Sequence, residues 1–596
     1  MSQAVLVCWR AKGAGETPVP KASAKQFFGE LSSNVFPIEF CKTPPVVIED
    51  HSMFAGVFNP KATVGFCERC FFLGAIQSGD DWHEFGGNDI NGSYSIFRTN
   101  DNEIELVTDA VASRTIWYYF DDTIFIASTS QAAITYVLGS FEPNEELLTW
   151  MVSNGTLGPG SCGWDRRVRR IEPDTIICVN RKTWEIKAKQ APIYFSVSEG
   201  SEEEKREALE GAVRIAMQTI SLPHKDWSIL LSGGYDSRAI ISLLENPHEY
   251  RTVSWGMAAH RNEHRTDASV ADMLSKEFGT LHSFMELDAT DAVPQSIGDA
   301  ENLISNFLQI GDGRSDNISG YMDNFSVWRA LSRAGVQGVV RGDEGFGWIE
   351  SQTESQVRLS LGVALWSDFV NVPSLKSFGF AQDQKLPAEL ERQNDETLDS
   401  WRDRLYHTYR LPVALAALND LKTPFVEIAN PLLSRNIIKI TRGLSDSQRT
   451  DKSLFRQIVH EVSPHIPFAK HESTLTLDGA LRLPAVAGYL QEMLDVDGDR
   501  CLLPSRFLHF AQSGISSEVL TDTLKKNRLR STLRGLLPAK AKNWLQSNFV
   551  GTRLDGNIIA FRCVIINLMQ NRLSGISQLG AGRLFNRDGR GEVPDE

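Results

Sequence analysis

Ser232-Gly233-Gly234-Tyr235-Asp236-Ser237-Arg238 is the stretch of this 596-residue chain that decides its fold. The apolar run 229–231 precedes it and the run 239–244 follows, which predicts a buried strand, a glycine turn and a helix start. Because glycines lack Cβ atoms, successive amides can point at one anion, and the helix N-terminus adds its dipole. The candidate phosphate-binding residues are Leu231, Ser232, Gly233, Gly234 and Ser237. Asp236 suits an anionic ligand only if Mg²⁺ bridges the carboxylate to the phosphates.

The loop is neither a Walker A motif nor a dinucleotide-binding GxGxxG motif. The surrounding pattern alternates between helix and strand. We expect helices over 202–219, 237–245 and 266–278, and strands over 227–231, 251–255 and 281–287. This alternation predicts a doubly wound parallel sheet, with the loop at the carboxyl ends of its strands.

The rest of the chain divides into two further regions. Residues 1–198 are rich in short apolar runs separated by turn residues, which indicates a β-rich layered domain. A polar, acidic stretch follows, and the parallel-sheet domain occupies 199–475. Residues 476–596 are expected to be a helical extension of that domain, with a disordered tail near 587–596. The fold class is therefore mixed, α/β with α+β.

Composition excludes several classes of function. The net charge of −14 disfavours binding to nucleic acid or to an anionic membrane. Neither a membrane-spanning apolar run nor a secretory signal is recognisable, and the eight cysteines show no disulfide spacing, so we expect a cytoplasmic protein. Cys67 and Cys70 form an isolated CxxC pair that we interpret as incidental.

Several motifs, taken in order, resemble those of the asparagine synthetase family over about residues 54–475. They are the loop 232–237, Val253–Met257, Gly279–His282, the acidic loop Val339–Gly347, Glu427 with Pro431–Leu433, and Thr450–Arg456. The resemblance implies an N-terminal domain like an Ntn-hydrolase glutaminase. It also implies an adenine-nucleotide α-hydrolase-like synthetase domain that uses ATP.

The resemblance also implies roles for individual residues. The backbone of Ser254, Trp255 and Gly256 would hold adenine, with Gly342 beside the phosphates. Asp236 and Asp343 would hold Mg²⁺ on the leaving pyrophosphate. The catalytic residues implied are Lys452, Glu344 and Asp343. We expect His282 to be a hydrogen-bonded structural histidine rather than a catalytic one.

The glutaminase-like region departs from the family. Such glutaminases use an N-terminal cysteine whose own amine is the base. This chain has Ser2, its Cys8 and Cys41 are internal, and the resemblance opens near Phe54, some fifty residues in. In the synthetase region Val340 replaces a glutamate of the ammonia-using members and Ser434 replaces an aspartate. We therefore expect a domain that makes no ammonia.

Without ammonia, the activated carboxylate must meet another amine, most simply one on the same substrate. Two family branches work in this way, the β-lactam synthetases and the lasso-peptide cyclases. The length of the chain and the basic clusters at 166–170 and 525–534 favour a cyclase. The resemblance then implies ATP, Mg²⁺ and a peptide substrate, with a leader-peptide-binding protein and a peptidase as partners.

Three alternatives stay open. One is a glutamine- or ammonia-dependent amidotransferase acting on a small acid or sugar acid. Another is an RNA-thiolating enzyme, which would need cysteines near its site. The third is a non-catalytic binding partner, which Asp236, Asp343 and Lys452 argue against.

Overall fold

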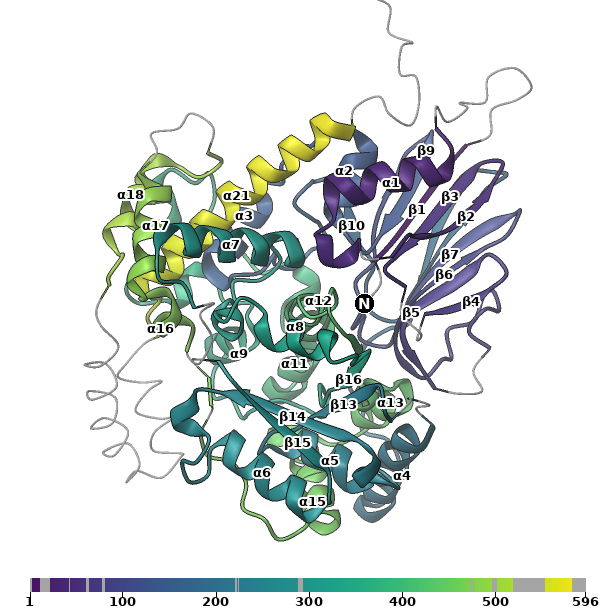
Figure 1. Cartoon of the computed structure of the whole chain (residues 1–596), viewed down its shortest axis with the longest axis vertical. Coiled ribbons are helices and arrows are strands. Elements are labelled where there is room, and N and C mark those ends of the chain that lie inside the picture. Colours follow the sequence, from purple (N-terminus) through teal and green to yellow (C-terminus); the bar gives the residue numbers. More distant parts are fainter. Residues whose placement is uncertain are drawn as a thin grey trace, which may run out of the picture.

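The chain folds into two antiparallel sheets, one parallel sheet and a set of C-terminal helices, as a computed structural model shows (Figure 1). The structure describes residues 3–10, 22–41, 43–60, 64–77, 81–219, 222, 224–287, 293–471, 473–474, 476–495, 501–517 and 552–580. The predicted disordered tail, 587–596, and the basic cluster 525–534 lie outside these residues.

The N-terminal domain is a sandwich of two six-stranded antiparallel sheets. The strand order of the first sheet is β10 (Arg169–Arg170), β8 (Trp117–Phe120), β9 (Ile124–Ser128), β1 (Gln3–Trp9), β3 (Met53–Phe58) and β2 (Val46–Asp50). That of the second is β12 (Glu185–Gln190), β11 (Thr175–Asn180), β7 (Glu103–Thr108), β6 (Gly92–Thr99), β5 (Cys70–Ile76) and β4 (Gly65–Cys67). Apolar side chains of both sheets interdigitate, among them Leu6, Ala55, Leu73 and Leu106.

The sandwich begins at β1 rather than near Phe54, so the expected opening is wrong. β1 pairs with β3 on one side and β9 on the other, deep inside the first sheet. All seven residues of β1 are buried, because one face meets the second sheet and the other meets helices α1 (Ala24–Val35) and α2 (Gln131–Leu138). A strand buried on both faces lacks the apolar–polar alternation that identifies a half-exposed strand.

The predicted parallel sheet is confirmed. Its strand order is β15 (Leu281–Glu286), β14 (Arg251–Gly256), β13 (Trp227–Leu230), β16 (Gly338–Val340) and β17 (Glu427–Ala429), with every neighbouring pair parallel. Ile229 packs toward α4 (Glu202–Thr219) and α5 (Tyr235–Leu243), whereas Leu230 packs toward α7 (Ile297–Gly311) and α8 (Ser326–Arg333). Helices therefore cover both faces, and α6 (Asp267–Glu277) crosses between β14 and β15.

The C-terminal helices connect the two domains. They are α16 (Leu477–Leu481), α17 (Pro484–Leu494), α18 (Ser505–Ser513) and α21 (Gly556–Gly580). The long helix α21 runs from α17 and α18 across to α2 and α3 (Glu146–Asn154) of the sandwich domain, as Figure 1 shows. Its Arg562 donates to the carbonyls of Val152 and Ser153, at 3.0 and 2.7 Å.

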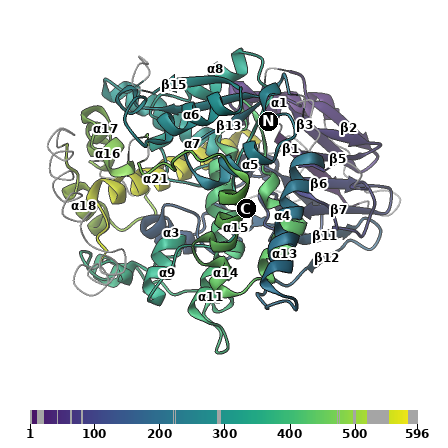
Figure 2. The ribbon, with the colours of Figure 1, turned by 90° about the horizontal axis from the view of Figure 1, so that it is seen from below.

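The remaining helices of the synthetase domain lie between the acidic loop and β17 and after β17. Between the acidic loop and β17 lie α9 (Glu354–Leu361), α10 (Leu375–Phe378), α11 (Leu398–Leu405), a π-helix (Tyr406–Leu415) and α12 (Ala416–Asp420). After β17 come α13 (Arg435–Arg442), which packs beside α4 (Figure 2), α14 (Asp446–Arg449) and α15 (Ser453–Val462). None of the helices within the described ranges combines the length and apolarity needed to cross a membrane.

Candidate active site

The glycine loop joins β13 to α5 as the sequence predicts. Gly234 is the residue before the first turn of α5, and Asp236 lies in that turn. Ser237 closes the loop, because its Oγ accepts from the Ser232 amide at 3.1 Å and lies 3.0 Å from Ser232 Oγ. The Gly233 amide donates to Asp267 Oδ1 at 3.1 Å. The result is a tight turn with a helix N-terminus behind it, which is the geometry that binds phosphates.

Three glycines in and around the loop lie so close to other segments that a side chain at these positions would collide with them. A Cβ on Gly342 would lie 2.8 Å from Asp236 Cβ, so the acidic loop packs directly on the glycine loop. A Cβ on Gly233 would lie 2.4 Å from Ala469 Cβ, and one on Gly256 would lie 2.5 Å from Ser473 Cβ. Ala469 therefore covers the glycine loop, and Ser473 covers the end of β14; we call these residues the covering segment.

Lys452 lies between two carboxylates at the centre of the site. Its Nζ is 3.0 Å from both oxygens of Asp236 and 2.8 Å from Glu344 Oε1. Asp451 and Lys452 both have left-handed backbone, with φ of 54° and 57°, although neither is glycine. Such conformations cost of order 1–3 kcal/mol each and concentrate at functional sites. These two residues directly precede α15, and their conformation directs the Lys452 side chain at Asp236.

The charges of this cluster shift the titration of its members. Removal from water raises the pKa of Asp236 to about 6; Lys452 opposes the shift, and the carboxylates of Glu344 and Asp343 add to it. Burial alone would lower the pKa of Lys452, but Glu344 and Asp236 raise it above its ordinary value. Lys452 therefore keeps a permanent positive charge.

The acidic loop is held by the helices that follow it. Asp343 accepts from Arg341 Nε at 2.6 Å and from Asn419 Nδ2 at 2.9 Å. Glu344 accepts from the Phe346 amide at 2.6 Å, and Tyr406 OH donates to Glu344 Oε1 at 3.0 Å. Glu344 is thus fully engaged as a partner of Lys452, whereas Asp343 faces the cavity.

A cavity of about 410 Å³ lies over the ends of three neighbouring strands, β14, β13 and β16. It brings together the predicted residues Leu231, Ser232, Asp236, Ser237, Ser254, Trp255, Gly342 and Asp343. Gly233, Gly234, Gly256, Glu344 and Lys452 are not part of its lining. Of these, Lys452 pairs with Asp236 of the lining and Glu344 pairs with Lys452, whereas Gly233 and Gly256 pack against the covering segment.

Sequence reasoning missed four polar residues of the lining, namely Arg341, Asp267, Ser473 and Thr474. Arg341 directly precedes Gly342 and Asp343, so its place in the motif was a usable signal. Asp267 and the pair 473–474 belong to no motif and reach the site only through tertiary packing.

The proposed adenine side of the cavity is formed by β14. Trp255 packs edge-on against Trp328, with ring centroids 5.3 Å apart. Ser254 Oγ lies 3.0 Å from His282 Nε2, and Thr252 Oγ1 lies 2.9 Å from His282 Nδ1. Both ring nitrogens of His282 are thus engaged by neighbouring hydroxyls, which fits the structural role expected for this histidine.

The residues present fit ATP with Mg²⁺. Asp236 and Asp343, which line one cavity, supply the hard carboxylate oxygens that Mg²⁺ prefers. The start of α5 supplies amides for phosphates, whereas the amides of Ser232, Gly233 and Gly234 already donate to side chains of the protein. Trp255 supplies an aromatic wall for a base.

The sequence departures fall away from this cavity. Val340 is buried in the core of the sheet. Ser434 lies at the domain junction, where it accepts from Gln77 Nε2 at 3.1 Å.

Cys8 is a buried residue of β1, and burial raises the pKa of its thiol to about 12. The basic cluster at 166–170 is largely neutralised, since Arg166, Arg167 and Arg170 pair with acids of their own domain.

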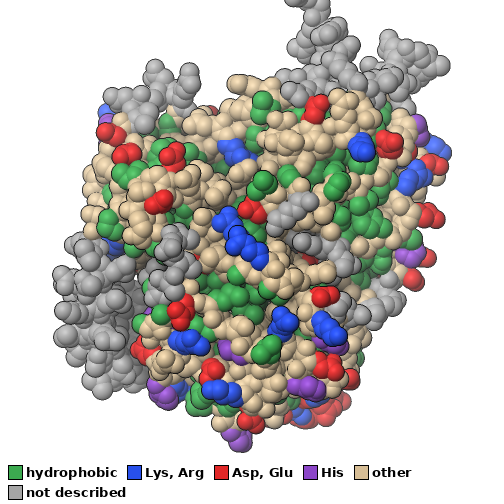
Figure 3. All heavy atoms as spheres, viewed as in Figure 1, with side chains coloured by type: hydrophobic (Ala, Val, Ile, Leu, Met, Phe, Trp, Pro, Cys, Tyr) green, Lys and Arg blue, Asp and Glu red, His purple; other side chains and the backbone are tan. Residues whose placement is uncertain are grey.

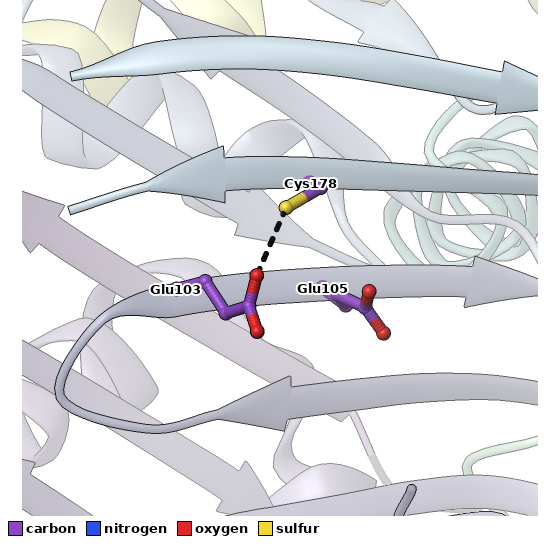
Figure 4. Close-up of side chains that lie close together, drawn as sticks. All are labelled: Glu103, Glu105 and Cys178. Atoms are coloured by element: carbon purple, nitrogen blue, oxygen red, sulfur yellow. Dashed lines mark hydrogen bonds between the residues drawn. The ribbon is translucent and has the colours of Figure 1, made fainter. Parts of the chain in front are cut away.

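Among the residues that the structure describes, one group outside this cavity has side chains close enough to share a metal ion. Glu103, Glu105 and Cys178 lie together on neighbouring strands of the second sheet (Figure 4). Glu105 is already paired with Arg98 at 2.9 Å and accepts from the Gly86 amide. Burial and the Glu103 carboxylate raise the pKa of the Cys178 thiol to about 11, so the thiol donates to Glu103. These contacts account for the cluster without a metal.

Comparison with known proteins agrees with the nucleotide half of the site. Residues 204–312 match the family model described as asparagine synthase. That segment contains the glycine loop and β14, whereas Asp343 and Lys452 lie outside it. No curated protein sequence matches. A solved structure titled as the allosteric regulatory enzyme of purine biosynthesis is 9% identical, covering 49% of this chain and 82% of its own, with a TM-score of 0.19.

Proposed function

We propose that this protein is an AMP-forming, ATP-dependent synthetase that activates a substrate carboxylate and joins it to an amine. The observation that carries the proposal is the meeting of Lys452 with Asp236 and Glu344 beside the glycine loop. The match of residues 204–312 to the asparagine synthase family supports an ATP-dependent carbon–nitrogen ligase.

Each residue of the site has a task in this reaction. Bound Mg·ATP supplies an electrophilic α-phosphorus and a pyrophosphate leaving group. The amides at the start of α5 would bind the pyrophosphate, and Asp236 with Asp343 would hold its Mg²⁺. Lys452 places a fixed positive charge where negative charge develops, and Glu344 keeps its amine in position. The covering segment near Ser473 limits access of water to the activated carboxyl.

The amine comes from the substrate itself rather than from glutamine. The cysteine of β1, Cys8, is buried and protonated, which is unsuited to a glutaminase nucleophile. Where the sandwich meets the synthetase sheet, the buried Arg114 pairs with Glu427 and donates to the carbonyl of Ile428. A packed, charged junction of this kind is a poor route for ammonia.

The substrate class we favour is a peptide whose N-terminal amine attacks an activated Asp or Glu side chain, giving a lasso-peptide macrolactam. A further cavity of about 700 Å³ is lined by Thr450, Asp451 and Ser453, the chain neighbours of Lys452, and we assign the peptide to it. Holding amine and carboxyl together supplies up to roughly 7–11 kcal/mol of the barrier. A leader-peptide-binding protein and a peptidase would be the partners of such a cyclase, in the cytoplasm.

The test is incubation with Mg·ATP and a panel of linear peptides carrying Asp or Glu at ring-closing distance. We expect equal amounts of AMP and pyrophosphate and a peptide product that has lost one water. The same peptides with an acetylated N-terminus should give no cyclic product.

Asp236→Ala should abolish pyrophosphate release, whereas Asp272→Ala, which removes an exposed carboxylate on α6, should not. Release of glutamate from glutamine, with amidation of a small acid instead of peptide cyclisation, would replace the cyclase by an amidotransferase. Full activity of Asp236→Ala would refute the site.

A further inference from the structure

Arg341 occupies a position in the cavity that the motif does not explain. It is the first residue after β16, and its amide donates to the carbonyl of Ala429 at 2.9 Å, which fixes its backbone to β17. Its side chain lines the 410 Å³ cavity and is 24% exposed. Only Nε has a protein acceptor among the described residues, Asp343 Oδ1 at 2.6 Å. The two Nη groups are thus available to a ligand.

Arg341 is also the one cation among the described residues that line this cavity, beside the carboxylates of Asp236, Asp267 and Asp343. Lys452 approaches the cavity only through Asp236. Lys422 lies behind Arg341 and is 4% exposed, with its amine donating to the carbonyl of Leu418. The guanidinium of Arg341, at the end of β16, is therefore the cationic group that an anionic ligand in this cavity would contact.

The position of Arg341 relative to the nucleotide follows from the neighbours. Lys422 is close enough to influence Arg341 electrostatically, and its Nζ lies 5.7 Å from the ring of Trp328. Trp328 in turn packs against Trp255 on the proposed adenine side. Arg341 thus lies on the side of the cavity where Lys422, Trp328 and Trp255 pack, and the glycine loop at the end of β13 lies between it and the adenine wall of β14.

We propose that Arg341 binds the α-phosphate of the nucleotide. This inference rests on the proposed function and deepens it. A guanidinium fork matches two phosphate oxygens, and it can do so while Nε still holds Asp343. The α-phosphate is the group that the substrate carboxylate must approach. Neutralising its oxygens lowers the repulsion between two anions and places Arg341 at the reacting atoms.

The test is calorimetric titration of the full-length protein and Arg341→Gln with adenosine, AMP and Mg·pyrophosphate. We expect Arg341→Gln to bind AMP about tenfold or more weakly, since a hydrogen-bonded charge is lost. Adenosine should bind within about twofold of wild type, and Mg·pyrophosphate, which loses only the Arg341 partner of Asp343, should lose less affinity than AMP. Arg341→Lys, which keeps the charge but not the fork, should fall between. Arg333→Gln, which removes an exposed arginine on α8, is the matched control and should bind all three ligands normally.

Different outcomes would overturn the assignment of Arg341 and the proposed synthetase function. Wild-type AMP affinity in Arg341→Gln would overturn the inference, and would leave the guanidinium to the substrate carboxylate. Weaker binding of Mg·pyrophosphate alone would overturn the α-phosphate assignment too. Loss of adenosine binding in both the Gln and Lys variants would make Arg341 structural and also overturn it. Failure of the wild-type protein to bind either adenosine or AMP would overturn the proposed function.

Discussion

At the scale of residues, the site brings opposite charges close together. Two residues adopt strained left-handed backbone conformations to do so, and glycines allow the loops to approach each other. Lys452 neutralises Asp236 and Glu344, and the left-handed conformations of Asp451 and Lys452 direct it there. Motif reasoning finds these residues because each sits in a recognisable loop. It misses Asp267 and Ser473, which reach the cavity from segments without a pattern.

Glu344→Gln tests the role of Glu344 as the partner that positions Lys452. The carboxamide oxygen can still accept from the Phe346 amide, and Tyr406 OH keeps its bond to the backbone carbonyl of residue 344, so the loop should keep its shape. Lys452 loses one of its two counter-ions, and we expect pyrophosphate release to fall by about 10- to 100-fold. Mg·ATP affinity should change little. Glu277→Gln, at an exposed position on α6, is the control. Unchanged turnover in Glu344→Gln would remove Glu344 from the mechanism.

Gly342→Ala tests the close approach of the two loops. The added Cβ would lie 2.8 Å from Asp236 Cβ and 3.1 Å from the Ser237 amide, so the loops must separate. We expect loss of Mg²⁺-dependent nucleotide binding, measured by calorimetry, with the protein still folded. Gly211→Ala on α4 meets nothing within 4 Å and should raise stability by about 0.5–1 kcal/mol. Normal nucleotide binding by Gly342→Ala would mean that the two loops are not coupled.

At the scale of elements, the π-helix Tyr406–Leu415 organises the acidic loop. Tyr406 OH donates to the carbonyl of Glu344 at 2.6 Å, and His407 Nε2 donates to the carbonyl of Gly345 at 2.8 Å. Arg410 lies 4.5 Å from the ring of Trp348. π-Helical turns are rare and are common at functional sites. Sequence patterns do not reveal this one, since Pro412 within it would ordinarily end a helix.

The same scale shows which elements a single sequence can predict. Helices α4 and α6 and strands β13, β14 and β15 lie where the pattern places them, within one or two residues. Helix and strand alternate along this stretch and the glycine motif marks its start, which identifies β13 although it is buried throughout. Strand β1 was missed because both of its faces are buried. The acidic loop was found by motif, but the helices that hold it were not.

His407 gives the π-helix a dependence on pH. It is fully buried, its Nδ1 accepts from Arg442 Nε at 3.3 Å, and burial lowers its pKa well below 6.5. His407 therefore takes up a proton near pH 6.5 in the unfolded chain but stays neutral in the folded chain. The free energy of unfolding falls as the pH drops below 6.5. Between pH 6.5 and 5.5 the loss is about 1 kcal/mol.

Urea denaturation at pH 7.5 and 5.5 measures this effect. His407→Gln should lose less stability on acidification than the wild type. His224→Gln, which removes a half-exposed histidine, is expected to follow the wild type. Identical pH dependence in wild type and His407→Gln would show that His407 is not the group responsible.

At the scale of the whole molecule, the sandwich and synthetase domains form one packed unit. Arg114 meets Glu427, Asn430 N donates to Ser93 Oγ at 3.2 Å, and α21 crosses from one domain to the other. On the face shown in Figure 3, acidic and basic side chains are intermixed over the synthetase sheet. The domain order was predictable from composition and motifs. The junction was not, because its partners lie more than 300 residues apart in the chain.

Arg114→Met tests how far the junction stabilises the molecule. Arg114 and Glu427 are both buried, so removing the arginine leaves an unpaired buried carboxylate. We expect the free energy of unfolding to fall by about 3–5 kcal/mol. The double variant Arg114→Met/Glu427→Gln should recover part of this loss.

Arg166→Gln is the matched control for Arg114→Met. Its side chain is 68% exposed, and loss of its surface pair should cost at most about 1 kcal/mol. Equal losses in Arg114→Met and Arg166→Gln would show that the buried pair does not hold the domains together.

The identity of the nucleotide product is the measurement that tests the central claim most directly. Phosphorus NMR of the reaction with Mg·ATP and the peptide panel should show AMP and pyrophosphate, with neither formed by Asp236→Ala. Formation of ADP and inorganic phosphate, or the same AMP yield from Asp236→Ala, would contradict the account.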